Sequence, residues 1–141
     1  MAPTTIAPTN RPQTVPTRVR FVAPLIGLEE RRDFRLRQDR GSALYVMRAV
    51  GDPSVRFLLA EPFLICPHYE VSLADGDARE LGVEHPEDAL VLVTLTVRRE
   101  PPGVTANLLA PLVIARDSGR GRQLVLDDRR YSLRHPLTGS R

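Results

Sequence analysis

The sequence predicts an all-β fold, mainly antiparallel, in the form of a small β-barrel-like domain with one or two short helices. Two observations support this prediction. Short apolar or alternating runs recur at roughly even spacing, and Gly- or Pro-containing turn signals separate them. Only one stretch has the composition of a helix. Seven or eight short strands in this pattern are typical of an antiparallel barrel or sandwich.

The first seventeen residues differ from the rest of the chain. They are rich in Pro and Thr, and they carry only Ile6 and Val15 as large aliphatic side chains. Such a segment buries too little apolar surface to offset the entropy that ordering would cost. We therefore expect residues 1–17 to form a disordered tail and residues 18–141 to form a single domain.

Strand patterns follow the tail in the first half of the chain. The run RVRF at residues 18–21 alternates apolar and charged side chains, and a second alternating run surrounds residues 34–36. Two apolar runs, residues 43–50 and 55–60, flank the turn signal GDPS and predict a hairpin. A short strand is expected at residues 69–73, after two prolines that mark an edge or a bend.

The second half of the chain contains the strongest strand pattern. Residues 89–97, ALVLVTLTV, include five β-branched side chains among nine residues. PPG then predicts a turn, residues 104–115 run back, and DSGRG turns the chain again. Residues 122–128 close the set. The final stretch, residues 129–137, either adds a last short strand or packs across an open end.

Charge falls into three blocks along the chain. Residues 1–60 carry ten arginines against five acidic residues, and residues 91–141 carry nine against four. The acidic block, residues 61–90, carries eight acidic residues and one arginine, and it contains the helix-like stretch that Gly82 is expected to end. A nucleic-acid-binding protein gathers its basic residues on one face. The acidic interruption instead favours a basic protein partner, unless the block is only a solvated face.

Residues with catalytic or metal-binding potential do not form a recognisable site. Cys66 and His68 have the spacing of one strand face, but Pro67 separates them and no orienting acid is evident. A metal site would need these two to converge with His85 and His135, and the spacings do not match a zinc finger. We therefore predict no catalytic, cofactor or metal residues. The single cysteine, together with the lack of a leader or membrane-span pattern, favours the cytoplasm.

Two motifs in the C-terminal half resemble the FliW family of bacterial flagellar assembly factors. That family carries a Thr-Ala-Asn-Leu-x-Ala-Pro run, followed by Gly-x-Gln, an apolar pair with Leu, and a Tyr. The similarity extends upstream through PLIGLEERRDFRL and DPSVRFLLAEPFLICPHYEVSL, and it spans about residues 19–137. The chain departs from the family at Ala115, where Asn is usual, and in its basic net charge of +3. The first glycine of the family's Gly-hydrophobic-x-Gly segment is either replaced by Pro24 or absent. The matching positions are Thr105, Ala106, Asn107, Leu108, Ala110, Pro111, Gly121, Gln123, Val125, Leu126 and Tyr131.

The resemblance implies a binding protein without catalytic activity. Family members bind flagellin and CsrA, a small RNA-binding regulator that represses flagellin translation, and exchange of these partners couples translation to export. A monomer, with no membrane and no direct nucleic-acid partner, is the simplest expectation. The alternative is a small β-barrel that binds RNA directly through its arginine-rich segments, although aromatic side chains for base stacking are few. A small enzyme ranks last.

Two candidate partner surfaces follow from these motifs. Pro111 is tolerable where a strand bulges or runs along an edge, and Asn107 is expected to bond backbone groups that the irregularity leaves free. Thr105, Asn107, Leu108 and Pro111 either only shape the barrel or form an interrupted edge where an extended flagellin end adds as a strand. The second surface would attract basic CsrA through acidic side chains. These are Asp75, Asp77, Glu80, Glu84, Glu87 and Asp88.

Overall fold

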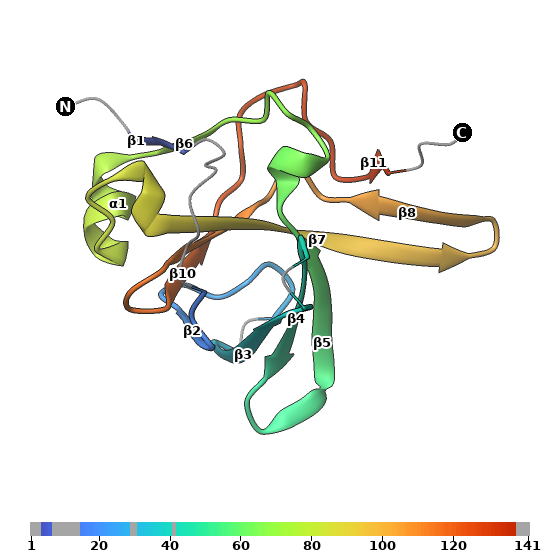
Figure 1. Cartoon of the computed structure of the whole chain (residues 1–141), viewed down its shortest axis with the longest axis horizontal. Coiled ribbons are helices and arrows are strands. Elements are labelled where there is room, and N and C mark those ends of the chain that lie inside the picture. The colour runs from blue at the N-terminus through green and yellow to red at the C-terminus, as the bar shows by residue number, and fades with distance from the viewer. Residues whose placement is uncertain (1–3, 7–14, 29–30, 41, 138–141) are drawn as a thin grey trace.

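The computed structural model describes residues 4–6, 15–28, 31–40 and 42–137. Strands dominate it, with one α-helix and two 3₁₀ turns (Figure 1). In chain order the elements are β1 (Thr4–Ile6), β2 (Arg18–Phe21), β3 (Asp33–Gln38), β4 (Leu44–Ala49), β5 (Asp52–Ala60), η1 (Pro62–Leu64), β6 (Val71–Leu73), α1 (Asp75–Leu81), η2 (Pro86–Asp88), β7 (Ala89–Arg99), β8 (Pro102–Ala106), β9 (Leu112–Ala115), β10 (Arg120–Gln123) and β11 (His135–Pro136).

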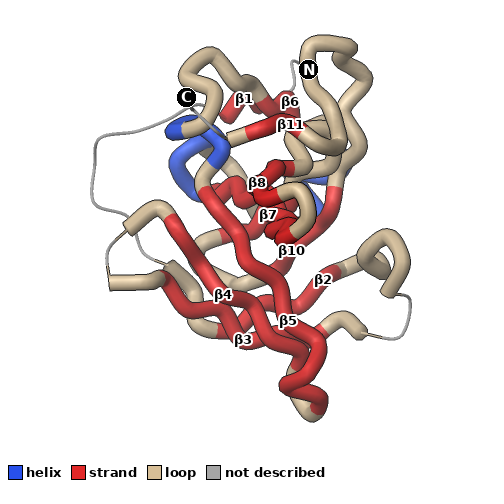
Figure 2. Tube along the Cα trace, turned by 90° about the vertical axis from the view of Figure 1, so that its right-hand side faces the viewer, coloured by secondary structure: helices blue, strands red, loops and turns tan. Residues whose placement is uncertain are grey.

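Seven of the strands close into a ring. Their order is β7-β5-β4-β3-β2-β10-β9, and β9 returns to pair with β7. All neighbours in the ring are antiparallel except β2 and β10, which are parallel. Figure 2 shows β3, β4 and β5 running side by side. The predicted all-β, mainly antiparallel barrel is therefore confirmed.

The second half of β7 leaves the ring as a hairpin arm with β8. Arg99 lies opposite Pro102, so Glu100 and Pro101 alone form the turn. In Figure 1 this arm projects away from the body, on the side opposite α1. The short strand β11 pairs with β8, so the final stretch adds a last strand, the first of the two alternatives that the sequence left open.

Two apolar cores lie on opposite faces of the ring wall. The inner core fills the barrel and includes Phe21, Phe34, Tyr45, Met47, Leu59, Leu90, Leu92 and Leu112. The outer core lies between β7, β9, β6 and α1 and includes Tyr69, Leu81, Val91, Val93, Leu108, Val113 and Tyr131. Residues 89–93 are buried without a break because one face of β7 lines each core. This explains why the strongest strand pattern in the sequence is continuous rather than alternating.

The expected disordered tail is wrong for residues 4–6. They form β1, which pairs antiparallel with β6, and Ile6 lies opposite Val71. Ile6 is only 2% exposed because it packs in the outer core. One large aliphatic side chain is therefore enough to anchor this segment once β6 offers a strand edge. Residues 1–3 and 7–14 of the expected tail lie outside the described residues.

Several strand boundaries also differ from the sequence predictions; β8, for example, begins at Pro102, inside the predicted PPG turn. β5 begins at Asp52, so the turn of the β4–β5 hairpin is formed by Val50 and Gly51, where Gly51 has φ +85°. Residues 104–115 are two strands rather than one, and regular pairing ends at Gln123 rather than Asp128. Helix α1 ends as predicted, since Gly82 adopts φ 79° at its C-terminus. Within the described ranges, no helix has the length and apolar character that a membrane crossing requires.

Candidate partner-binding site

The motif segment, residues 105–111, bulges out of the barrel wall. Ala106 lies opposite Leu95 on β7, whereas Leu112 lies opposite Leu92. Five residues of this segment therefore span a gap that only two residues span on β7. Because β9 is hydrogen-bonded to β7 on one side and to β10 on the other, the break lies within the ring and not along an edge. Pro111 is tolerated by the bulge, the first of the two explanations that the sequence allowed.

Asn107 bonds the backbone at the centre of this bulge. Its Oδ1 accepts the backbone N–H groups of Leu109 at 3.2 Å and Ala110 at 3.0 Å. Its own backbone N–H donates to the Thr94 carbonyl at 2.9 Å. The Ala110 carbonyl accepts the Gln123 side-chain amide at 3.2 Å. The predicted role of Asn107 as a cap for irregular backbone is confirmed.

The remaining backbone groups of the bulge are also bonded. Leu108 donates its N–H to Ser132, and its carbonyl accepts the Tyr69 hydroxyl at 2.6 Å. Burial raises the pKa of the Tyr69 phenol well above its usual range. Two further bonds join the bulge to the chain after β10, from the Leu124 N–H to the Pro111 carbonyl at 2.9 Å and from the Leu126 N–H to the Leu109 carbonyl at 2.8 Å. Residues 108–111 therefore offer no unpaired backbone group. An extended flagellin end could not add as a strand at these residues, because no backbone donor or acceptor is free to pair with it.

The four motif residues proposed to contact a partner have different exposures. Leu108 is 1% exposed in the outer core, and Pro111 is buried. Thr105 and Asn107 are half-buried; Thr105 lies in β8 opposite Thr96. The structure therefore assigns Leu108 and Pro111 to packing, and only Thr105 and Asn107 keep access to the surface.

An apolar pocket of about 200 Å³ opens beside the bulge. Its rim includes two well exposed aliphatic side chains, Ile26 at 68% and Leu133 at 57%. This volume is below the ~300–1,000 Å³ of typical small-molecule sites, so it suits one or two side chains of a protein partner. The lining residues are Leu25, Ile26, Met47, Phe57, Thr94, Asn107, Ala110, Leu112, Gln123 and Leu133.

Gln123 joins the motif to the pocket rim. Its Oε1 accepts the Ile26 backbone N–H at 2.9 Å while its amide donates to Ala110. The turn that carries Ile26 includes Gly27, whose φ of +86° favours glycine. Asn107 lines the same pocket, and among the described residues no hydrogen bond engages its Nδ2. The pocket thus combines an apolar lining with one available amide donor.

The acidic block does not form a single free patch. Arg122 on β10 pairs with Asp77 at 3.4 Å and with Glu80 at 3.0 Å. Asp88 Oδ2 accepts the backbone N–H groups of Glu84 and His85. Asp77, Glu80 and Asp88 are therefore occupied within the chain. Glu84 and Glu87 are exposed, and no ion pair engages them in the described part of the chain.

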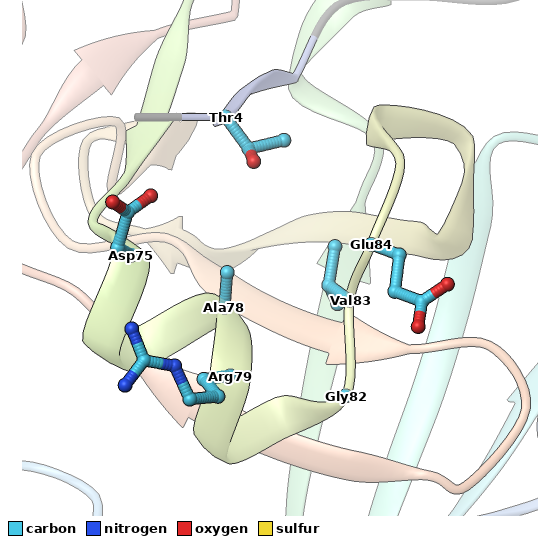
Figure 3. Close-up of a pocket in the computed structure, with 7 residues that line it drawn as sticks. All are labelled: Thr4, Asp75, Ala78, Arg79, Gly82, Val83 and Glu84. Atoms are coloured by element: carbon cyan, nitrogen blue, oxygen red, sulfur yellow. The ribbon is translucent and has the colours of Figure 1, made fainter. Parts of the chain in front are cut away.

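A hollow of about 300 Å³ separates α1 from β1 near these residues (Figure 3). Thr4 faces it from β1, and Ala78 and Val83 line it from below. Asp75 and Glu84 stand on opposite sides of it, and Arg79 also lines it, so the hollow carries charged groups of both signs.

The residues weighed for catalysis and metal binding are separated by burial. Cys66 is half-buried and packs against the outer core, whereas His68 is exposed. His85 directly precedes η2 as its N-cap residue, and His135 lies in β11. Across the described ranges, no group of three or more His, Cys, Asp or Glu side chains is arranged to hold a metal ion.

The sequence pattern does not predict the residues that complete the pocket. Ile26, Met47, Phe57 and Leu133 come from separate parts of the chain and meet only in the folded barrel. The only local feature of the sequence that could have indicated an exposed apolar surface is an apolar side chain in a turn, such as Ile26. Together, fold and site define a closed β-barrel protein with an apolar surface pocket built around a bulged strand.

The comparisons with known proteins identify the family. A family described as "FliW protein" matches residues 7–137. The flagellar assembly factor FliW of Desulfitobacterium hafniense (strain DSM 10664 / DCB-2) is 38% identical over 120 residues, covering 84% of this chain and 79% of that protein. The FliW of Shouchella clausii is 35% identical over 118 residues, covering 83% and 81%. A crystal structure of a flagellar assembly factor FliW superposes with a TM-score of 0.75 at 32% identity, covering 86% of both chains. The chain belongs to the FliW family of flagellar assembly factors.

Proposed function

We propose that this chain binds flagellin and the translational regulator CsrA in exchange, and so relieves CsrA repression of flagellin translation. FliW family membership over residues 7–137 is the observation that supports this role. The role requires binding surfaces and no reaction chemistry. The exchange would take place in the cytoplasm, with the chain acting as a monomer.

We assign flagellin to the apolar pocket. The pocket is lined by Asn107, Ala110 and Gln123, three of the residues that carry the family resemblance. A protruding aliphatic or aromatic side chain of flagellin would enter between Ile26 and Leu133. Burial of that side chain would supply the binding energy, and Asn107 Nδ2 would donate to a carbonyl of the incoming chain.

We assign CsrA to the surface around Glu84 and Glu87. A regulator that binds RNA carries basic surface, and exposed carboxylates attract it and raise the association rate. Asp77, Glu80 and Asp88 contribute less than the sequence indicated, because Arg122 and backbone amides already engage them.

The flagellin assignment is tested by reversing the polarity of the pocket rim. The double variant Ile26→Arg/Leu133→Arg should weaken flagellin binding at least about tenfold in isothermal titration, because each arginine places a charge over the apolar pocket. Leu64→Arg/Val97→Arg is the matched control, since Leu64 is 72% and Val97 62% exposed and both lie outside the pocket. Equal flagellin affinity in the rim variant and the control would refute the assignment.

The CsrA assignment is tested by charge reversal. Glu84→Lys/Glu87→Lys should weaken CsrA binding several-fold and flatten its dependence on salt, because exposed charges act mainly through screened attraction. Asp39→Lys/Glu100→Lys changes the same charge at exposed positions elsewhere on the barrel. If both double variants lose affinity equally, only net charge matters and the placement at η2 is wrong.

A further inference from the structure

Four arginines form a row across the outer face of the barrel wall. Arg18 lies opposite Arg35, Arg35 lies opposite Arg48, and Arg48 lies opposite Arg56. These residues come from β2, β3, β4 and β5, and all four are exposed. Their neighbours along each strand point into the inner core, so the arginines share the opposite face. Because adjacent strands lie ~4.8 Å apart, the arginine row is about 14 Å long.

The arginine row has little local charge compensation. Like charges directly opposite each other on neighbouring strands are destabilising. Nearby arginines do find acids, since Arg20 pairs with Asp33 at 3.0 Å and Arg31 pairs with Asp52 at 2.7 Å. In the part of the chain that the structure describes, no ion pair engages any member of the row. The row therefore places four positive charges, without ion-pair partners among the described residues, along one line of the sheet.

The row matches the chemistry of a phosphate chain. Guanidinium groups bind phosphate oxygens through two parallel hydrogen bonds, and a single-stranded nucleic acid is flexible enough to place successive phosphates along the row. The aromatic side chains of β2–β5 face the inner core, so this face offers no platform for stacking bases. We infer that the arginine row binds the phosphate backbone of a single-stranded nucleic acid without reading its sequence.

This inference revises the expectation from sequence that no nucleic acid is bound. There the acidic block, residues 61–90, favoured a protein partner, and direct RNA binding was the alternative. The register across β2–β5 gathers four arginines into one line. The inference goes beyond the exchange of flagellin and CsrA and does not depend on it. Its residues are distinct from the pocket rim and from Glu84 and Glu87, so the two proposals can fail separately.

The test measures the salt dependence of binding. The probe is a fluorescein-labelled oligouridylate of about twelve nucleotides, followed by fluorescence anisotropy from about 25 to 200 mM NaCl. Four phosphate contacts predict that log K falls with log salt at a slope of about −3, since each contact to a single strand contributes about −0.7. Arg35→Gln/Arg48→Gln should halve this slope and weaken binding about tenfold or more at low salt. An oligodeoxythymidylate of the same length should bind within about threefold, because the contacts are to phosphate.

The control variant removes the same number of positive charges at positions outside the arginine row. Arg98→Gln/Arg134→Gln removes two exposed arginines elsewhere and should leave the affinity within about twofold. Arg18→Gln/Arg56→Gln, at the two ends of the row, should reproduce the loss seen at its centre. Equal weakening by row and control variants would overturn the inference, because net charge alone would explain it. Displacement by polyglutamate as effective as by unlabelled oligouridylate would also overturn it and indicate an acidic protein partner.

Discussion

Asn107 shows how one side chain keeps an irregular strand folded. Its single oxygen serves two backbone amides, of Leu109 and Ala110, that the bulge removes from the ladder. Pro111 needs no such partner because it has no N–H group to donate. The residue type and its spacing from Pro111 were enough to predict this role from the sequence. Which backbone amides Asn107 bonds could be determined only from the folded structure.

Substitution of Asn107 should therefore cost stability as well as binding. Asn107→Ala leaves two backbone N–H groups without their acceptor, which should lower the free energy of unfolding by about 2 kcal/mol in urea titrations. Asn107→Asp is the control, because it keeps an acceptor oxygen at the same position and replaces the Nδ2 donor with a second, negatively charged carboxylate oxygen. It should retain most of the stability while weakening flagellin binding. Equal loss of stability in both variants would contradict the capping role.

The closure of the barrel depends on the approach of β10 to β2. Gly121 lies opposite Phe21 in the parallel pair, and a Cβ built there would come within 2.9 Å of the Phe21 ring. Phe21 is 1% exposed and packs edge-on against Phe34 at a centroid distance of 5.6 Å. The ring therefore has little room to yield. The glycine in the Gly-x-Gln motif is explained by packing rather than by backbone conformation.

Gly121→Ala should open this contact. We expect it to lower the free energy of unfolding by about 1–3 kcal/mol, because the added methyl group overpacks the inner core. Gly103→Ala on β8 is the matched control, since a Cβ there would meet no atom within 4 Å. Differential scanning calorimetry should show a lower Tm for the first variant and a nearly unchanged Tm for the second. An unchanged Tm for Gly121→Ala would show that β10 can shift away from β2.

Most strands could be predicted from the sequence because side-chain alternation reports which face is buried. The pattern could not report where regular pairing stops. Leu124 and Leu126 alternate like strand residues and pack against the outer core, yet their N–H groups bond to the bulge rather than to a regular ladder. β1 was missed because three residues carry too little signal without their partner β6. The pocket and the arginine row depend on contacts between distant strands, which no local pattern contains.

The whole molecule is organised around a wall that two cores share. β7 places Leu90 and Leu92 in the inner core and Val91 and Val93 in the outer core. β9 does the same with Leu112 and Val113. Because β7 and β9 contribute side chains to both cores, a change that displaces these strands from one core also disrupts the packing of the other. The pocket lies beside this shared wall, and Met47, Phe57 and Leu112 of the inner core line it, so its geometry depends directly on the inner core.

Damage to either core should therefore unfold the entire described domain in one transition. Leu90→Ala, in the inner core, should lower the free energy of unfolding by about 3 kcal/mol, and Val91→Ala, in the outer core, by somewhat less. Val97→Ala is the control, because Val97 is 62% exposed and its loss should change stability by no more than about 0.5 kcal/mol. Urea titrations followed by the NMR amide signals of each core should give one shared midpoint per variant. If Leu90→Ala unfolds the inner core while the outer-core signals persist, the two cores are independent and the shared wall does not couple them.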